Sequence, residues 1–162
     1  MKHDDFRLKR PESPSLVEAD FDPHGGDLDA QSAWKTFGGK TLVEAYELFL
    51  TNPLHFQEDY MWMGARAFDY YFPVVDEHLR AANAEQEWED HEVGILGSCL
   101  FFQLKVESQK PSIQTQREMA ELAEFVLGNL GNFVPSMKEQ GRIRQEWLAV
   151  QAALEGGGGP VR

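Results

Sequence analysis

Apolar residues recur along most of this chain at the three- and four-residue spacings of amphipathic helices. The first predicted helix covers residues 41–52, where Thr41 and Glu44 form a capping box and an Asn-Pro pair closes the apolar stripe. The second covers residues 64–83 and contains Pro73, which predicts a kink or a new turn. The pattern therefore predicts two helices in the first half of the chain.

The second half repeats this spacing three more times. Helices are predicted over residues 85–106, 111–131 and 136–155. The apolar stripe of the last one follows the i, i+4, i+7, i+11 rule, with Ile143, Trp147, Val150 and Leu154. No segment alternates with the period of a strand for long enough to require a sheet. We therefore expect an all-α fold, a compact bundle of about five helices.

Both ends of the chain lack this periodicity. Residues 1–30 mix prolines, glycines and many acidic residues, so we expect a flexible acidic N-terminal arm. Residues 156–162 begin with four glycines and a proline, which predicts a disordered Gly-rich tail. Residues 31–155 are expected to form a single helical domain, because this length can bury one core.

Composition narrows the classes of partner. The formal net charge of -12 repels nucleic-acid phosphates and anionic lipids, and it favours basic partners. The longest apolar run, around Cys99, is far shorter than the roughly 20 residues that span a bilayer. The first residues lack the apolar stretch of a secretory signal, and a single cysteine allows no intrachain disulfide. We expect a cytoplasmic protein that binds neither nucleic acid nor membrane.

The negative charge is concentrated in one part of the sequence. Residues 41–92 hold twelve Asp and Glu against Arg66 and Arg80 alone, a net of -10, whereas residues 93–162 are neutral. A basic partner would associate faster with such a region through electrostatic steering.

The densest acidic segment, residues 85–92, has two interpretations. On a helix, Glu85, Glu89 and Glu92 share one face, and their repulsion would be relieved by a basic partner. Alternatively, these acids lie near a helix N-terminus, where the dipole favours them, and only keep the protein soluble.

An aromatic-rich segment, residues 56–73, also has two interpretations. It carries seven aromatic residues in eighteen positions, interleaved with acids and methionines, which is typical of an interface core. Alternatively, the rings fill the core of the bundle. Phe68, Tyr71 and Phe72 are expected in the core in either case. Tyr60 and Trp62 are expected on the surface.

The two segments together define one candidate binding face for a basic protein partner. Its members combine carboxylates with aromatic rings, and they are Asp59, Tyr60, Trp62, Glu85, Glu87, Trp88, Glu89 and Glu92. These side chains would cover a basic surface of the partner.

Motifs of catalysis and metal binding are missing from the sequence. No Glu-x-x-His or His-Glu-x-x-His pattern occurs, and one cysteine does not make a zinc site. Gly39-Lys40-Thr41 is similar to the end of a phosphate-binding loop, but Trp34 stands where that loop needs its first glycine. We instead expect these glycines to end a short helix. The sequence therefore predicts no catalytic residue, metal or cofactor.

One segment resembles other proteins. Met63–Pro73 has the sequence Met-Gly-Ala-Arg-Ala-Phe-Asp-Tyr-Tyr-Phe-Pro. It resembles a segment of uncharacterised small bacterial all-α proteins, in which an Ala-Phe-x-Tyr-Tyr-Leu-Pro-like run follows an acidic loop. Some proteins of that type are regarded as immunity- or defence-associated. The likeness covers about a tenth of the chain, and Phe72 stands where those proteins have leucine.

Three hypotheses of function follow. The leading one is a non-enzymatic protein-binding module, of the immunity or adaptor type, that uses its acidic face to bind a basic partner. The second is a small enzyme that depends on carboxylates or a metal, with His55, His78 or His91. The third is a self-associating structural helical domain.

Overall fold

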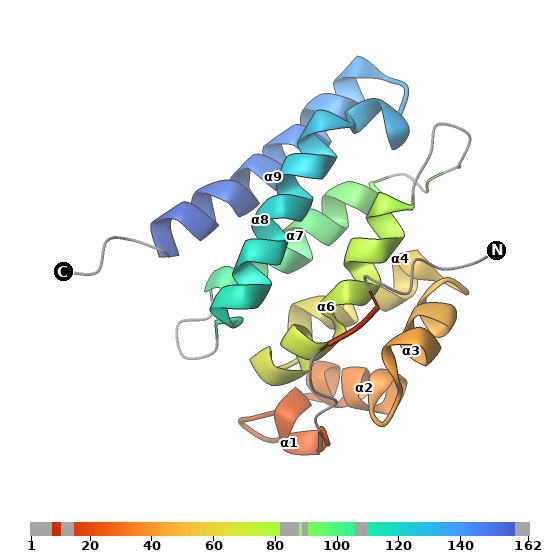
Figure 1. Ribbon diagram of the computed structural model, residues 1–162, viewed down its shortest axis with the longest axis vertical. Coiled ribbons are helices and arrows are strands. Elements are labelled where there is room, and N and C mark those ends of the chain that lie inside the picture. The colour runs from red at the N-terminus through yellow and green to blue at the C-terminus, as the bar shows by residue number, and fades with distance from the viewer. Residues whose placement is uncertain (1–7, 11–14, 82–87, 89–90, 106–109, 158–162) are drawn as a thin grey trace. The chain divides into compact units, whose positions relative to one another are not determined.

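The computed structural model describes residues 8–10, 15–81, 88, 91–105 and 110–157. Within these ranges every regular element is a helix (Figure 1), which confirms the predicted all-α class. The contacts divide the chain into two compact units, Met1–Ala81 and Ala82–Arg162, and each is described by itself.

The described part of the first unit contains six α-helices: α1 (Glu18–Phe21), α2 (Leu28–Phe37), α3 (Leu42–Phe49), α4 (Pro53–Phe56), α5 (Asp59–Trp62) and α6 (Ala65–Arg80). The described part of the second unit contains three α-helices and a 3-10 helix: α7 (Glu92–Lys105), α8 (Ile113–Gly128), η1 (Leu130–Asn132) and α9 (Met137–Gly157). The predicted count of about five helices is wrong. α1, α4 and α5 have four residues each, too few for an apolar stripe to repeat.

Capping side chains explain where two helices of the first unit begin. The carboxylate of Asp27 accepts hydrogen bonds from the amides of Asp29 and Ala30, at 2.9 and 3.2 Å, and so starts α2. The predicted capping box of α3 is confirmed. The Thr41 amide donates to Glu44 at 2.9 Å, and the Glu44 amide donates to the Thr41 hydroxyl at 3.1 Å. Such bonds satisfy amides that a first helical turn leaves without partners.

Residues 15–30, part of the predicted flexible arm, contain α1 and the start of α2, and a few of their side chains are buried in the first unit. Phe21 is fully buried, and its ring lies 5.3 Å from that of Trp34 and 6.0 Å from that of Tyr71. Asp22 is buried as well, and it accepts a hydrogen bond from the side chain of Gln31 at 3.2 Å. Pro23, Gly25 and Gly26 lie in the turn that joins α1 to α2.

The predicted single domain of residues 31–155 includes parts of both units. The contacts divide the chain after Ala81, and the predicted domain begins at residue 31. Helix α9 continues to Gly157, past the predicted start of the tail. Residues 1–7 and 11–14 of the predicted arm, and residues 158–162 of the predicted tail, lie outside the described residues.

Helix α6 contains Pro73 and runs through it. Proline has no amide hydrogen, so the carbonyl of Asp69, four residues earlier, loses its helical partner. The guanidinium of Arg10 takes that place, because Nε and a terminal nitrogen both donate to the Asp69 carbonyl, at 3.1 and 2.5 Å. Leu8, two residues before Arg10 in the sequence, is buried. The described part of the N-terminal segment is therefore bound to α6.

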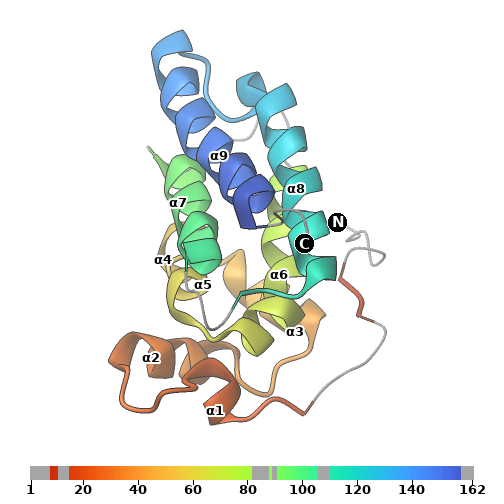
Figure 2. The ribbon, with the colours of Figure 1, turned by 90° about the vertical axis from the view of Figure 1, so that its left-hand side faces the viewer.

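In the second unit, α9 packs against both α7 and α8 (Figure 2). Trp147 of α9 is fully buried, and its Nε1 donates to the Val93 carbonyl of α7 at 3.0 Å. Gly97 allows this approach, because a Cβ at that position would lie 2.9 Å from the same Nε1 atom. The missing side chain of Gly97 and the bulk of Trp147 therefore fit each other.

Helix α7 begins later than predicted. Trp88 has no helical structure, and His91 has a φ of 67°, which no right-handed helix contains. The His91 carbonyl accepts the first helical hydrogen bond, from the Ile95 amide at 2.8 Å. The prediction of one helix over residues 85–106 is therefore wrong at Trp88 and His91, and residues 85–87, 89, 90 and 106 lie outside the described residues.

Candidate functional site

A cavity of about 200 Å³ lies in the second unit between the start of α7 and the first half of α9. Its apolar walls come from Trp88, Val93, Ile95, Val134 and Ile143. Its polar lining comes from His91, Glu92, Gly94, Ser98, Glu139, Arg142, Gln145 and Glu146. We call this cavity the acidic pocket. Such a mixture of apolar walls and a few convergent polar groups is typical of binding sites.

A hydrogen bond across the acidic pocket fixes one of its carboxylates. The Ser98 hydroxyl of α7 donates to Oε2 of Glu146 on α9 at 2.7 Å. The neighbouring Trp147 anchors α9 to the Val93 carbonyl, which sets the register of the two helices. The position of the Glu146 carboxylate therefore follows from the core packing below it.

The acidic pocket carries a negative excess. Three carboxylates, one guanidinium and one imidazole line it, which leaves a net of -2 when His91 is neutral. Among the described residues, Arg142 makes no ion pair with Glu139 or Glu146, so it does not cancel their charge by contact. A cation that enters the pocket would meet these carboxylates.

Trp88 adds an aromatic wall to the acidic pocket. Its side chain is half-buried, and its ring lies 5.1 Å from that of Phe133 at an angle of 71°. Phe133 is itself buried, so the edge-to-face contact holds the indole in place. An indole face next to carboxylates suits a cationic group, which gains from both.

The structure brings two of the predicted binding residues together, Trp88 and Glu92, which both line the acidic pocket. Glu92 is only 6% exposed, so it does not belong to an open acidic face. Glu85, Glu87 and Glu89 lie outside the described residues.

The other predicted binding residues lie in the first unit, and one of them was placed wrongly. Tyr60 is fully buried, so the prediction that it lies on the surface is wrong. Its hydroxyl donates to the Tyr71 carbonyl at 2.8 Å, and its ring lies 5.6 Å from that of Phe37. Burial with a satisfied hydroxyl makes Tyr60 a core residue. Trp62 is 37% exposed, as expected.

Asp59, at the start of α5, is half-buried. Burial raises the pKa of its carboxyl to about 6, and Glu58 and Asp29 act in the same direction. The charge of His55 and a hydrogen bond from Thr36 oppose this rise in pKa. Asp59 therefore changes its charge near neutral pH, unlike an ordinary surface aspartate.

Replacing Asp59 with asparagine is expected to stabilise the protein by about 1–2 kcal/mol at pH 7. The expected gain is smaller than the full pKa shift implies, because solvent screens the exposed part of the carboxyl group. The pKa of Asp59 is about 6 in the folded chain and has the ordinary value of 3.8 in the unfolded chain. Folding therefore takes up a proton when the pH lies between these two values. The free energy of unfolding of the wild type should therefore fall as the pH rises from 4 to 6. The free energy of unfolding of Asp59→Asn, measured by urea denaturation, should not show this fall. Glu47→Gln, an exposed change on α3 of the same unit that does not act on Asp59, is the control and should retain it.

The three histidines of the enzyme hypothesis lie in different surroundings. His55 is exposed, whereas His78 is buried with its ring 5.0 Å from that of Phe49. His91 alone lines the acidic pocket. Within the described ranges, no three His, Cys, Asp or Glu side chains form a group that could hold a metal ion. No helix in the described part of the chain has the length and apolar character needed to cross a membrane.

The polar residues that α9 gives to the acidic pocket were missed by sequence reasoning. Glu139, Arg142 and Glu146 follow each other at i, i+3 and i+7, so they share one face of a helix. That spacing was a usable signal. The partner of Glu146, Ser98, lies 48 residues away in the sequence, and only the packing of α9 on α7 brings the two together.

Comparisons with known proteins give no match for this chain. No protein-family model, no curated protein and no solved structure is significantly similar to it. The resemblance of Met63–Pro73 to small bacterial immunity-type proteins therefore stays a prediction.

Proposed function

We propose that this chain is a non-enzymatic protein-binding module that captures a basic partner, as an adaptor or an immunity-type protein does. One observation supports this most: the acidic pocket combines three carboxylates with an indole wall in a protein of net charge -12. A lysine or arginine side chain of the partner is the natural occupant.

The occupant would use both kinds of lining. Its aliphatic stem would lie against the apolar wall that includes Ile95 and Ile143, and its charged head would reach Glu139 and Glu146. A cation over an indole gains about 0.5–2 kcal/mol, depending on how far it is desolvated. A hydrogen bond to a charged group contributes about 1.5–3 kcal/mol.

The net charge of the whole chain supports capture at a distance. A negative protein attracts a basic partner before contact and so raises the association rate, an effect that salt screens. The acidic pocket would then fix one basic side chain and so supply the specificity. Binding should therefore weaken as the ionic strength rises.

Removing the two carboxylates that α9 contributes tests this proposal. In Glu139→Gln/Glu146→Gln, the affinity for a hexa-arginine peptide, measured by isothermal titration calorimetry, should fall at least about tenfold, because two charge-assisted contacts are lost. Glutamine at position 146 can still accept the hydrogen bond from Ser98, so the fold should persist.

The matched control is Glu121→Gln/Glu124→Gln. Both residues are exposed on α8 of the same unit, so the variant changes the net charge equally without touching the acidic pocket. Its affinity should fall less than about twofold, since only long-range charge is lost. Equal weakening by the two double variants would mean that the peptide binds the net charge alone.

A further inference from the structure

The described residues of the second unit also form a depression that is lined by lysines and by no carboxylate. It has a volume of about 460 Å³ and lies between the end of α7 and the last turns of α9. The residues that line it are Phe101, Leu104, Lys105, Lys110, Ala149, Ala152, Ala153 and Gly156. We call it the lysine groove.

Apart from its two lysines, the lysine groove is lined by apolar and small residues. Phe101 and Leu104 form one wall, and small residues of α9 form the other. From Ala149 to Gly156 this wall is about 10 Å long at 1.5 Å per residue. The volume falls within the range of small-molecule sites. The groove is therefore the right size for one extended alkyl chain, and it is too short for the area of a stable protein interface.

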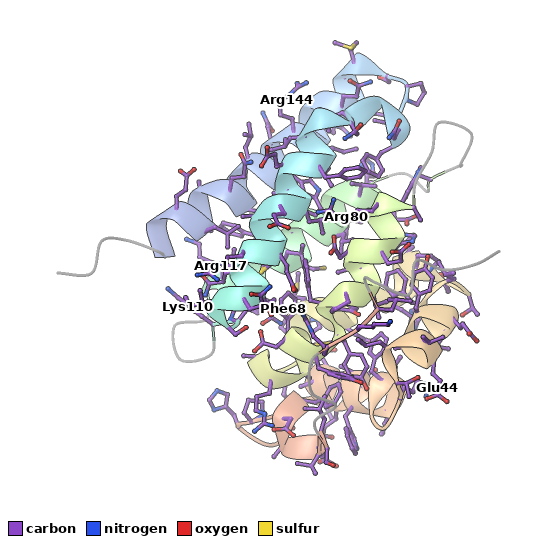
Figure 3. All side chains as sticks on the ribbon, viewed as in Figure 1. Glu44, Phe68, Arg80, Lys110, Arg117 and Arg144 are labelled. Carbon is purple, nitrogen blue, oxygen red and sulfur yellow. The ribbon has the colours of Figure 1, made fainter. Side chains whose placement is uncertain are left out.

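The only charged side chains that line the lysine groove among the described residues are Lys105 and Lys110. Both are exposed, and Lys110 precedes α8 on the side of the unit where α9 ends (Figure 3). Nζ of Lys105 lies 5.1 Å from the centre of the Phe101 ring. Without an anion, this ammonium is over an apolar ring. An anionic head group would attract it, and the ring would then be free to contact an apolar tail.

We propose that the lysine groove binds a small anionic amphiphile, such as a medium-chain carboxylate. The alkyl chain lies along the wall of α9, from Ala149 to Gly156, and covers Phe101. The carboxylate pairs with Lys105 and Lys110. This site is separate from the acidic pocket and does not depend on a basic partner.

The test is titration of the full chain with decanoate, below its micelle concentration, followed by amide chemical shifts and calorimetry. Shifts should concentrate at Phe101, Ala149 and Ala153. The affinity should rise about two- to fourfold per methylene from hexanoate to decanoate, because each buried methylene contributes up to about fourfold. Decyltrimethylammonium, with a tail of similar length and the opposite charge, should bind at least about tenfold more weakly.

Two variants and a control separate the contribution of the carboxylate to binding from that of the alkyl chain. Lys105→Gln/Lys110→Gln should weaken decanoate at least about fivefold, as expected for two exposed charge contacts. Ala153→Leu should fill the groove and weaken the binding of carboxylates of every chain length. Lys138→Gln, an exposed lysine at the other end of α9, should have no effect. Equal binding of the two decyl compounds, or binding of an acidic peptide but not of decanoate, would overturn the proposal.

Discussion

Replacing Trp147 with alanine is expected to cost the second unit about 3–5 kcal/mol, the range for losing a fully buried large aromatic side chain. The indole lies against Gly97 and donates to the Val93 carbonyl at 3.0 Å, so the variant loses both packing and a hydrogen bond. A loss of this size is a large part of the stability of a small domain. Urea denaturation followed by circular dichroism measures it.

Two milder changes separate the parts of this effect. Trp147→Phe keeps most of the ring but leaves the Val93 carbonyl without its indole donor, so about 1–3 kcal/mol should be lost. Gly97→Ala keeps the indole but places a Cβ 2.9 Å from Nε1, which should cost about 1–3 kcal/mol through overpacking. A Gly97→Ala variant as stable as the wild type would show that α7 and α9 are not packed this closely.

Replacing Arg10 with methionine is expected to cost about 2 kcal/mol, the second largest effect. Methionine keeps an apolar stem but cannot donate, so the Asp69 carbonyl loses the hydrogen bonds from Nε and the terminal nitrogen. The helix cannot replace them, because Pro73 has no amide hydrogen. Urea denaturation should show this loss although Arg10 and Asp69 are 59 residues apart.

A double-mutant cycle identifies the cause. In a Pro73→Ala background, the new amide at position 73 can donate to the Asp69 carbonyl itself. Arg10→Met should then cost less than about 1 kcal/mol, so the two changes should be coupled by more than about 1 kcal/mol. If Arg10→Met costs the same in both backgrounds, the guanidinium does not replace the missing helical bond.

The class of the fold was predictable because the longer helices bury one face each. α3, α6, α8 and α9 carry apolar stripes over two or more turns, and these stripes are local properties of the sequence. The helices within residues 15–37 were harder to predict from the sequence, because residue types such as glycine and proline in this region are also common in unstructured segments. Their order comes from tertiary contacts, such as that of Phe21 with Tyr71.

The surface was less predictable than the helices. Tyr60 and Trp62 are two residues apart in one acidic and aromatic segment, yet one is fully buried and the other is exposed. The difference arises because α5 is short and packs on α2, so the direction of each side chain depends on a tertiary contact. Burial of Tyr60 also needs an acceptor for its hydroxyl, and the Tyr71 carbonyl supplies it.

The start of α7, which lines the candidate site, was also less predictable from the sequence than the longer helices. The acidic composition of residues 85–92 was visible, and it suggested a helical face of glutamates. The positive φ of His91 breaks that helix, and Glu92 is buried. Two carboxylates of the acidic pocket come from α9 instead, which only the packing of α9 on α7 determines.

Amide chemical shifts recorded during a titration with a short arginine peptide test most directly whether the acidic pocket receives a basic side chain. Saturable shifts are predicted at Gly94, Ser98 and Glu146, together with the indole signal of Trp88, and they should weaken with added salt. Ala153 and Lys110, in the lysine groove, should not shift. Shifts spread evenly over exposed carboxylates on every helix, with none at Ser98 or Trp88, would contradict a specific pocket.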